Sequence, residues 1–175
     1  MLAGLFFGWL GDVLLMFESI RPLFFIFGLV GFLCGHLCYI FYFKNIATGY
    51  AKATKQQLLF VIPVAIYVAG LLYLLYPSLG ALKIPVTVYA IVLAAMLCVA
   101  LWLQYKIYKR VALFFVSGAV FFVLSDSVLA INKFYHSFSQ AGFIIMGSYC
   151  IAQYLIVRGA IKVYQGKSAL SEVKV

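Results

Sequence analysis

Two aspartates lie inside long apolar stretches of the sequence, where an ionisable side chain needs a chemical reason. Asp126 stands in the apolar run 111–131, and Asp12 stands in the run 1–17. A carboxylate at membrane depth costs several kcal/mol unless it is neutral, hydrated or paired with a partner. Two neighbouring carboxyl groups can share a reaction, because one keeps a proton to donate while the other supplies negative charge. The pair therefore predicts acid–base chemistry within a membrane.

The elements that must hold these aspartates are transmembrane helices. The 175 residues are 67% hydrophobic and only 10% charged, with a mean hydropathy of +1.13, far from the averages of soluble proteins. Long apolar runs must be helical, because lipid offers backbone groups no hydrogen-bond partner. The predicted fold class is all-α, a polytopic transmembrane bundle of about six spanning helices.

The bundle forms one domain, 1–163, and a mobile cytoplasmic tail is predicted for 164–175. Pro63 lies inside the third apolar run and predicts a kink in its helix. The six runs are 1–17, 22–43, 57–76, 84–105, 111–131 and 141–163.

Topology follows from the basic residues between the runs, because cytoplasmic connections keep an excess of lysine and arginine. Arg21, Lys83 and Lys133 lie in one set of connections, whereas the other set and the C-terminal end hold the remaining ten of the 13 basic residues. Both termini are therefore predicted to face the cytoplasm, across a bacterial inner membrane. This distribution accounts for the net charge of +9 without a nucleic-acid partner.

The depth of each aspartate follows from its position in the run, because each helical residue advances about 1.5 Å along the axis. Asp12 lies five residues before Phe17, and Asp126 lies five residues before Ile131. Both helices run outward, which places both carboxyls about 7–8 Å below the outer ends. The two aspartates share one level, where they can meet.

Five more polar side chains are predicted to line a cavity around the carboxyls. His36 lies on a helix that runs inward, deeper than the aspartates, and Tyr39 shares its face one turn further on. Ser125 adjoins the second aspartate. Tyr149 and Gln153 are four residues apart in the last run and form one polar face. Hydrogen bonding between packed helices would explain these residues equally well.

Small residues share a helix face with the first aspartate. Gly4, Gly8 and Asp12 follow one another at four-residue intervals, so they form one stripe, and the second run carries Gly31 and Gly35. Such stripes let two helices approach closely. An ordinary packing face is one interpretation, and the aspartate on the stripe favours a second, in which the close approach serves the site.

The cysteines predict neither a disulfide framework nor a metal site. Cys34, Cys38, Cys98 and Cys150 all fall inside apolar runs, where a thiol behaves as a small hydrophobic group. His36 lies about 200° round a helix from the two nearest cysteines, so the three do not form one ligand face. We expect no metal and no cofactor.

Four short motifs follow one another on successive helices: Gly11-Asp12; Gly35-His36 with Tyr39; Ser125-Asp126 with Leu129 and Ala130; and Tyr149 with Ala152 and Gln153. Their order and spacing resemble the YhhN-like lysoplasmalogenase family over almost the whole chain. The resemblance implies a multi-pass membrane hydrolase that cleaves the vinyl-ether bond of lysoplasmalogens, releasing a fatty aldehyde and glycerophosphocholine or glycerophosphoethanolamine. Family members usually have about eight spanning helices with the Gly-Asp motif on the third, so two N-terminal helices are absent from the pattern here.

Vinyl-ether hydrolysis begins with protonation of the alkene carbon, and the resulting oxocarbenium ion is attacked by water. Asp12 and Asp126 would supply the acid and the counter-charge, as paired carboxyls do in glycoside hydrolysis, and either could be the acid. The alternative class is a small-molecule or proton-coupled transporter that uses the same aspartates. The predicted partners are a lysophospholipid substrate and membrane lipids, and a homo-oligomer is left open.

The predicted depth of the carboxyls also indicates where a single-chain lipid would bind. Its head group would stay at the outer surface, its vinyl ether would lie at the level of the aspartates, and its tail would run between helices towards His36. Arg21 and Lys133, in the outer connections, would then contact the head-group phosphate. Both could equally be solvated interfacial charges.

Overall fold

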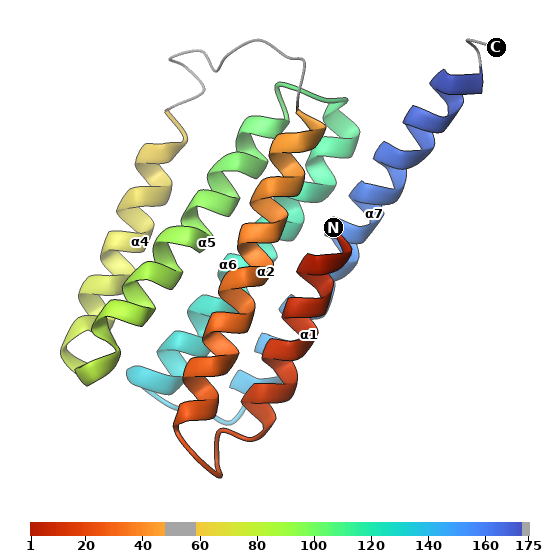
Figure 1. The fold of residues 1–175 in the computed structure, drawn as a ribbon. Coiled ribbons are helices and arrows are strands. Elements are labelled where there is room, and N and C mark those ends of the chain that lie inside the picture. Colours follow the sequence, from red (N-terminus) through yellow and green to blue (C-terminus); the bar gives the residue numbers. More distant parts are fainter. Residues whose placement is uncertain (48–58, 173–175) are drawn as a thin grey trace.

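A computed structural model describes residues 1–47 and 59–172, and every regular element in this part of the chain is helical (Figure 1). In these residues, five helical segments are long and apolar enough to cross a membrane when α4 is counted with η1 and α5 with η2, whereas α1 is shorter. The predicted all-α fold is confirmed, and the chain is an integral membrane protein. The elements are α1 (Leu2–Met16), α2 (Leu23–Ile46), α4 (Val61–Leu75), the short 3-10 helices η1 (Tyr76–Ser78) and η2 (Gly80–Leu82), α5 (Lys83–Leu103), α6 (Lys109–Phe134) and α7 (Ala141–Glu172).

The bundle is built from two helix pairs joined by a central helix. Helix α1 packs against α2, α6 packs against α7, and α5 contacts both α2 and α6. Helix α4 lies at the edge of the bundle against α5 (Figure 1). The connections α1–α2, α4–α5 and α6–α7 gather at the lower end of the figure. Lys52, Lys55 and Lys174, which the topology prediction used, lie outside the described residues.

Glycines allow α1 and α2 to approach backbone to backbone. A Cβ atom added at Gly31 would lie 3.1 Å from the Cα of Gly11, and one added at Gly35 would lie 3.3 Å from the carbonyl oxygen of Gly4. Larger side chains at these positions would push the helices apart. The predicted small-residue packing of the first two helices is confirmed, and it holds the short α1 in a fixed register on α2.

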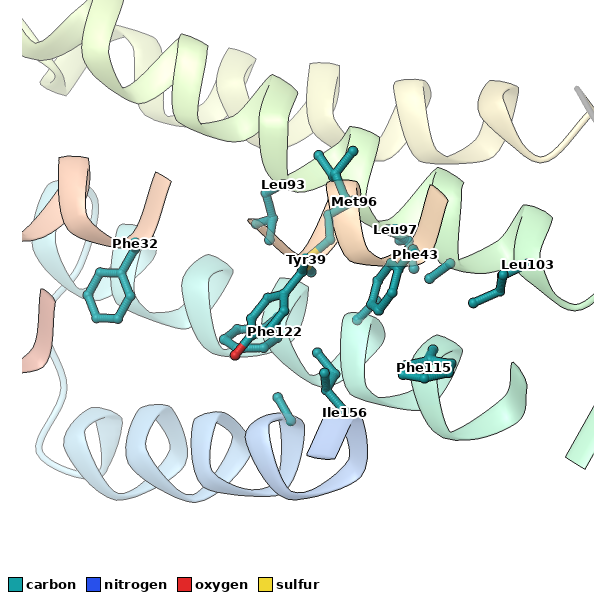
Figure 2. Packing of buried hydrophobic residues seen from close by; sticks show 14 of the residues in the cluster. Phe32, Tyr39, Phe43, Leu93, Met96, Leu97, Leu103, Phe115, Phe122 and Ile156 are labelled. Atoms are coloured by element: carbon teal, nitrogen blue, oxygen red, sulfur yellow. The ribbon is translucent and has the colours of Figure 1, made fainter. Parts of the chain in front are cut away.

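The apolar core includes Tyr39, one of the predicted site residues (Figure 2). Phe43, Met96 and Phe115 are fully buried where α2, α5 and α6 meet. Tyr39 and Phe122 belong to the same cluster, with ring centroids 6.0 Å apart. The core therefore fixes the helices whose polar side chains form the site.

Two helix boundaries differ from the prediction. Helix α4 begins at Val61, so Pro63 lies in its first turn, where a missing amide loses no intrahelical hydrogen bond. The predicted kink is therefore wrong. Helix α7 continues past residue 163, where the predicted span ended, to Glu172. The mobility of the segment 164–175 stays a prediction.

Candidate active site

Asp126 is held by side chains from two other helices. The Tyr89 hydroxyl of α5 donates a hydrogen bond of 2.7 Å to Asp126 Oδ2. The Nε2 atom of His36, on α2, lies 3.0 Å from the Tyr89 hydroxyl oxygen and 3.4 Å from the same carboxylate oxygen. His36 is only 2% exposed, whereas the Asp126 side chain is 13% exposed. The arrangement brings the predicted deep histidine into contact with the aspartate.

The hydrogen-bond directions assign the proton of the His36 ring. Because Tyr89 uses its own proton towards Asp126, His36 Nε2 must carry the hydrogen that the Tyr89 oxygen accepts. Nδ1 is buried and has no hydrogen-bond partner among the described residues. Nε2 therefore carries a hydrogen that is directed at Tyr89 and Asp126.

Asp12 is held by a chain of hydrogen bonds that reaches it from α7. Tyr39 donates a 2.5 Å hydrogen bond to the amide oxygen of Gln153, whose Nε2 donates a 3.0 Å bond to the Tyr149 hydroxyl. Tyr149 in turn hydrogen-bonds to Asp12. Since Gln153 occupies the lone pair of Tyr149, the tyrosine proton is free to point at the carboxyl group. All three bonds run in the same direction and end on Asp12.

The two carboxyls belong to one site. Asp12 and Asp126 are close enough to interact electrostatically, and both are partly buried. The ring of Phe122 forms a shared wall, with its centroid 5.1 Å from that of His36 and 5.6 Å from that of Tyr149. In this site, one aspartate faces two neighbouring donors, whereas the other lies at the end of a chain of hydrogen bonds.

The glycine stripe of α1 makes room for this donor chain. A Cβ atom added at Gly8 would lie 2.9 Å from both Gln153 Nε2 and the Tyr149 hydroxyl, and one added at Gly4 would lie 2.6 Å from the ring of Tyr39. The stripe thus contacts both the backbone of α2 and the side chains of the donor chain, so the structure is compatible with both interpretations.

Three predicted site residues lie apart from the carboxyl network. The Ser125 hydroxyl is buried and donates to the Ile145 carbonyl at 2.9 Å, so it joins α6 to α7. Lys133 Nζ forms a 3.0 Å ion pair with Glu18 at the ends of α6 and α1. Arg21 is exposed in the connection between α1 and α2.

Tyr89 is the residue that the sequence analysis missed, although a signal was available. Its run begins at residue 84 on the predicted outer side, so Tyr89 lies five residues below the predicted outer end. That is about 7–8 Å, the same depth that the counting gave for both aspartates. Applying the depth argument to every polar residue would have placed Tyr89 beside them.

The donor set suits proton transfer. Among the described residues, no group of three or more His, Cys, Asp or Glu side chains could hold a metal ion. The site instead offers two carboxyl groups, each with a tyrosine hydroxyl, beside a buried imidazole. One carboxyl can donate a proton while the other stays ionised, and partial exposure leaves each accessible to a bound molecule.

Comparisons with known proteins agree with the sequence motifs. The sequence model of the YhhN family matches residues 1–160. The chain is similar to a protein of Mycobacterium tuberculosis named lysoplasmalogenase, with 36% identity over 137 residues, 77% of this chain and 50% of that protein. It is also similar to human Lysoplasmalogenase TMEM86A, with 30% identity over 168 residues, 91% of this chain and 64% of that protein. The chain spans about half the length of its mycobacterial relative. No solved structure matches the chain significantly.

Proposed function

The chain belongs to the YhhN family, and from this premise we propose that it hydrolyses the vinyl-ether bond of lysoplasmalogens. The products would be a fatty aldehyde and glycerophosphocholine or glycerophosphoethanolamine. The names of the mycobacterial and human relatives support the substrate class. The observation that carries the proposal is the pair of interacting carboxyls, because the reaction needs an acid and a counter-charge at one place.

We assign the role of the acid to Asp12 and that of the counter-charge to Asp126. Asp126 accepts a hydrogen bond from Tyr89 and faces the Nε2–H of His36, and two donors stabilise a carboxylate. Among the described residues, the side-chain donor to Asp12 is Tyr149. We place the proton on Asp12, because fewer hydrogen-bond donors stabilise its ionised form than that of Asp126.

The reaction then proceeds in balanced steps. Asp12 gives its proton to the alkene carbon that is not bonded to oxygen, and the ether-bearing carbon becomes an oxocarbenium ion beside the Asp126 carboxylate. Water adds to this carbon and gives one proton to Asp126, which yields a hemiacetal. The bond from this carbon to the glycerol oxygen breaks, that oxygen takes the proton from Asp126, and the hemiacetal hydroxyl returns a proton to Asp12.

A labelling experiment tests this function. Purified protein is incubated with a lysoplasmalogen in D₂O, and the released aldehyde is analysed by mass spectrometry. We expect one deuterium on the carbon next to the carbonyl, because protonation occurs there. The matched control is the saturated alkyl-ether analogue, which has no alkene to protonate and should remain intact. Lack of aldehyde, or equal cleavage of the saturated ether, would contradict the proposal, and lipid flux in proteoliposomes without cleavage would favour the transporter.

We also propose that both termini face the cytoplasm of a bacterial cell and that the aspartates lie nearer the outer surface. The uneven distribution of basic residues supports this orientation. In a variant whose native cysteines have been replaced, Ser137→Cys should react with a membrane-impermeant thiol reagent in intact cells. Gln165→Cys, at the other end of α7, should react only after lysis. The reverse pattern would show the opposite orientation.

A further inference from the structure

A concave surface that does not include the carboxyl site lies where α4, α5 and α6 meet. A groove of about 390 Å³ runs between α4, α5 and α6. Its lining is aliphatic except for two hydroxyl groups, those of Tyr67 and Ser127, and Tyr67 donates a 2.7 Å hydrogen bond to Ser127. The Ser127 hydroxyl donates a hydrogen bond to the Val123 carbonyl, so both hydroxyls are satisfied. The groove therefore suits an apolar occupant.

The groove begins at the level of the carboxyl site. Its lining residues Ser127 on α6 and Ala90 on α5 directly follow Asp126 and Tyr89, the hydrogen-bonded pair of the site. From Ser127 it extends along α6 to Val120, seven residues and about 10 Å towards the end of the bundle away from Lys133. One end of the groove thus adjoins the reactive level, and the rest runs away from the polar surface.

The position of the groove relative to Asp126 matches the order of head group, vinyl ether and hydrocarbon chain in a single-chain lipid. A head group at the Lys133 end would place the vinyl ether near Asp126, and the chain beyond it would continue in the direction of the groove. The middle of the groove is lined by Ala94, a small residue that leaves space for the chain, and Val120 lines the far end. Along α4 the groove extends from Leu71 to Pro63, eight residues or about 12 Å.

We propose that this groove binds the hydrocarbon chain of the lysoplasmalogen and sets the preferred chain length. The inference rests on the proposed function for the identity of the lipid. It replaces the route towards His36 that the sequence suggested, because His36 lies on α2 and is buried against Tyr89, away from α4. The occupant is one chain of the substrate, which follows the groove past Ala94.

A matched pair of substitutions on α5 tests the proposal. Ala94→Phe fills the middle of the groove, whereas Ala95→Phe, one residue on, points to an exposed face outside the lining. The substrates are lysoplasmalogens with a butenyl chain, which ends before Ala94, and with an octadecenyl chain, which passes it. We expect Ala94→Phe to lower the ratio of kcat/KM for the long chain over the short chain at least about tenfold, since single methylenes in a pocket are worth that much. Ala95→Phe should leave the ratio unchanged, and an unchanged ratio in Ala94→Phe would overturn the proposal.

A crosslinking measurement on the unaltered protein makes the result independent of turnover and of the folding of the variant. The probe is a saturated alkyl-ether lysophospholipid with a diazirine in the first half of its chain, the part that would lie in the groove. Crosslinks should map to 90–97 and 120–127, and excess lysolipid but not a diacyl phospholipid should suppress them. Crosslinks spread over all lipid-facing helices would overturn the groove. If the protein cleaves neither vinyl ether, the proposed function fails, and the crosslinks still decide the groove.

Discussion

Asp126 and Asp12 are the same residue type in one site, but the structure holds them by different means. Asp126 lies within the 26-residue helix α6, and its partner Tyr89 packs in the apolar core. Asp12 lies near the end of the 15-residue helix α1, and its partner Tyr149 belongs to a chain of side chains on α7 and α2. The position of α1 itself depends on its glycine contacts with α2.

The difference indicates how a membrane protein can give two identical groups separate roles. The half of the site around Asp126 is built from long helices fixed by the core, so in the proposed mechanism donors that need not move would stabilise its charge. The half around Asp12 is a series of hydrogen-bonded side chains that packs against the glycine face of α1. Substitutions in α1 should therefore disturb the hydrogen bonds that end on Asp12. Substitutions in α5 should instead disturb those to Asp126.

The largest effect is expected from removing either carboxyl. Asp12→Asn and Asp126→Asn should each lower kcat on the order of 10²–10⁴-fold, the range for a lost acid or base. If the two act as a unit, the double variant should be about as slow as the slower single variant. Steady-state rates of aldehyde release from a lysoplasmalogen measure this. Full turnover in both single variants would refute the paired mechanism, and multiplied losses in the double variant would mean that the two act independently.

The second-largest effect is expected from removing the tyrosine hydroxyl that donates to each aspartate, and its size should differ between the two halves of the site. Tyr89→Phe removes the 2.7 Å hydrogen bond to Asp126, and Tyr149→Phe removes the donor of Asp12. A hydrogen bond to a charged group contributes about 1.5–3 kcal/mol, so Tyr89→Phe should slow the reaction roughly 10–100-fold. Tyr149→Phe should cost less, because its partner is the neutral acid.

The measurement for this pair is kcat/KM together with thermal stability in detergent. The control is Tyr73→Phe, an exposed tyrosine on α4, which should behave as wild type. Equal losses in the two site variants would contradict the assignment of one charged and one neutral aspartate.

A smaller effect is expected from the glycine stripe. Gly8→Ala puts a methyl group 2.9 Å from the Tyr149 hydroxyl and from Gln153 Nε2, both of which are ends of side chains that can shift. Overpacking of this kind costs typically 1–3 kcal/mol. We expect a lower melting temperature and roughly tenfold slower turnover, because the donor chain to Asp12 is displaced. Gly147→Ala on α7 is the matched control, since open space surrounds it.

Double variants that contain Gly8→Ala test whether the two halves of the site act separately. Combined with Asp12→Asn, the substitution should add little further loss of turnover, because both act on the same half. Combined with Tyr89→Phe, its effect should multiply, because the two halves are separate. The opposite pattern would place the donor chain with Asp126.

The sequence could predict the helices and the two aspartates because both follow from the cost of polar groups in lipid. Apolar runs of sufficient length must be helices, and an aspartate inside one requires a partner. The sequence could not predict how each helix is rotated about its axis. A helix of a water-soluble protein has a polar face that is exposed, so the opposite, apolar face marks the buried side. Helix α2 is apolar nearly all round, so its sequence does not show the direction in which His36 points.

Tyr89 was missed for a related reason. A tyrosine near the end of an apolar run also fits the membrane interface, where its ring and hydroxyl meet different surroundings. Only the rotation of α5 distinguishes such an anchor from a buried donor, and this is set by packing against α2 and α6. The glycine stripe, in contrast, was visible because glycine spacing is a property of one helix alone.

The smallest effect concerns the ion pair of Lys133 with Glu18, where both side chains are 37% exposed. If Lys133 contacts the head-group phosphate, Lys133→Gln should raise KM less than about fivefold and leave kcat unchanged, because exposed ion pairs contribute at most about 1 kcal/mol. Glu18→Gln should lower KM, since it frees the ammonium group for the phosphate. Both shifts should shrink at high salt, which screens exposed charges. If KM is the same in wild type and both variants, the two side chains are solvated surface charges, and the head group is held elsewhere.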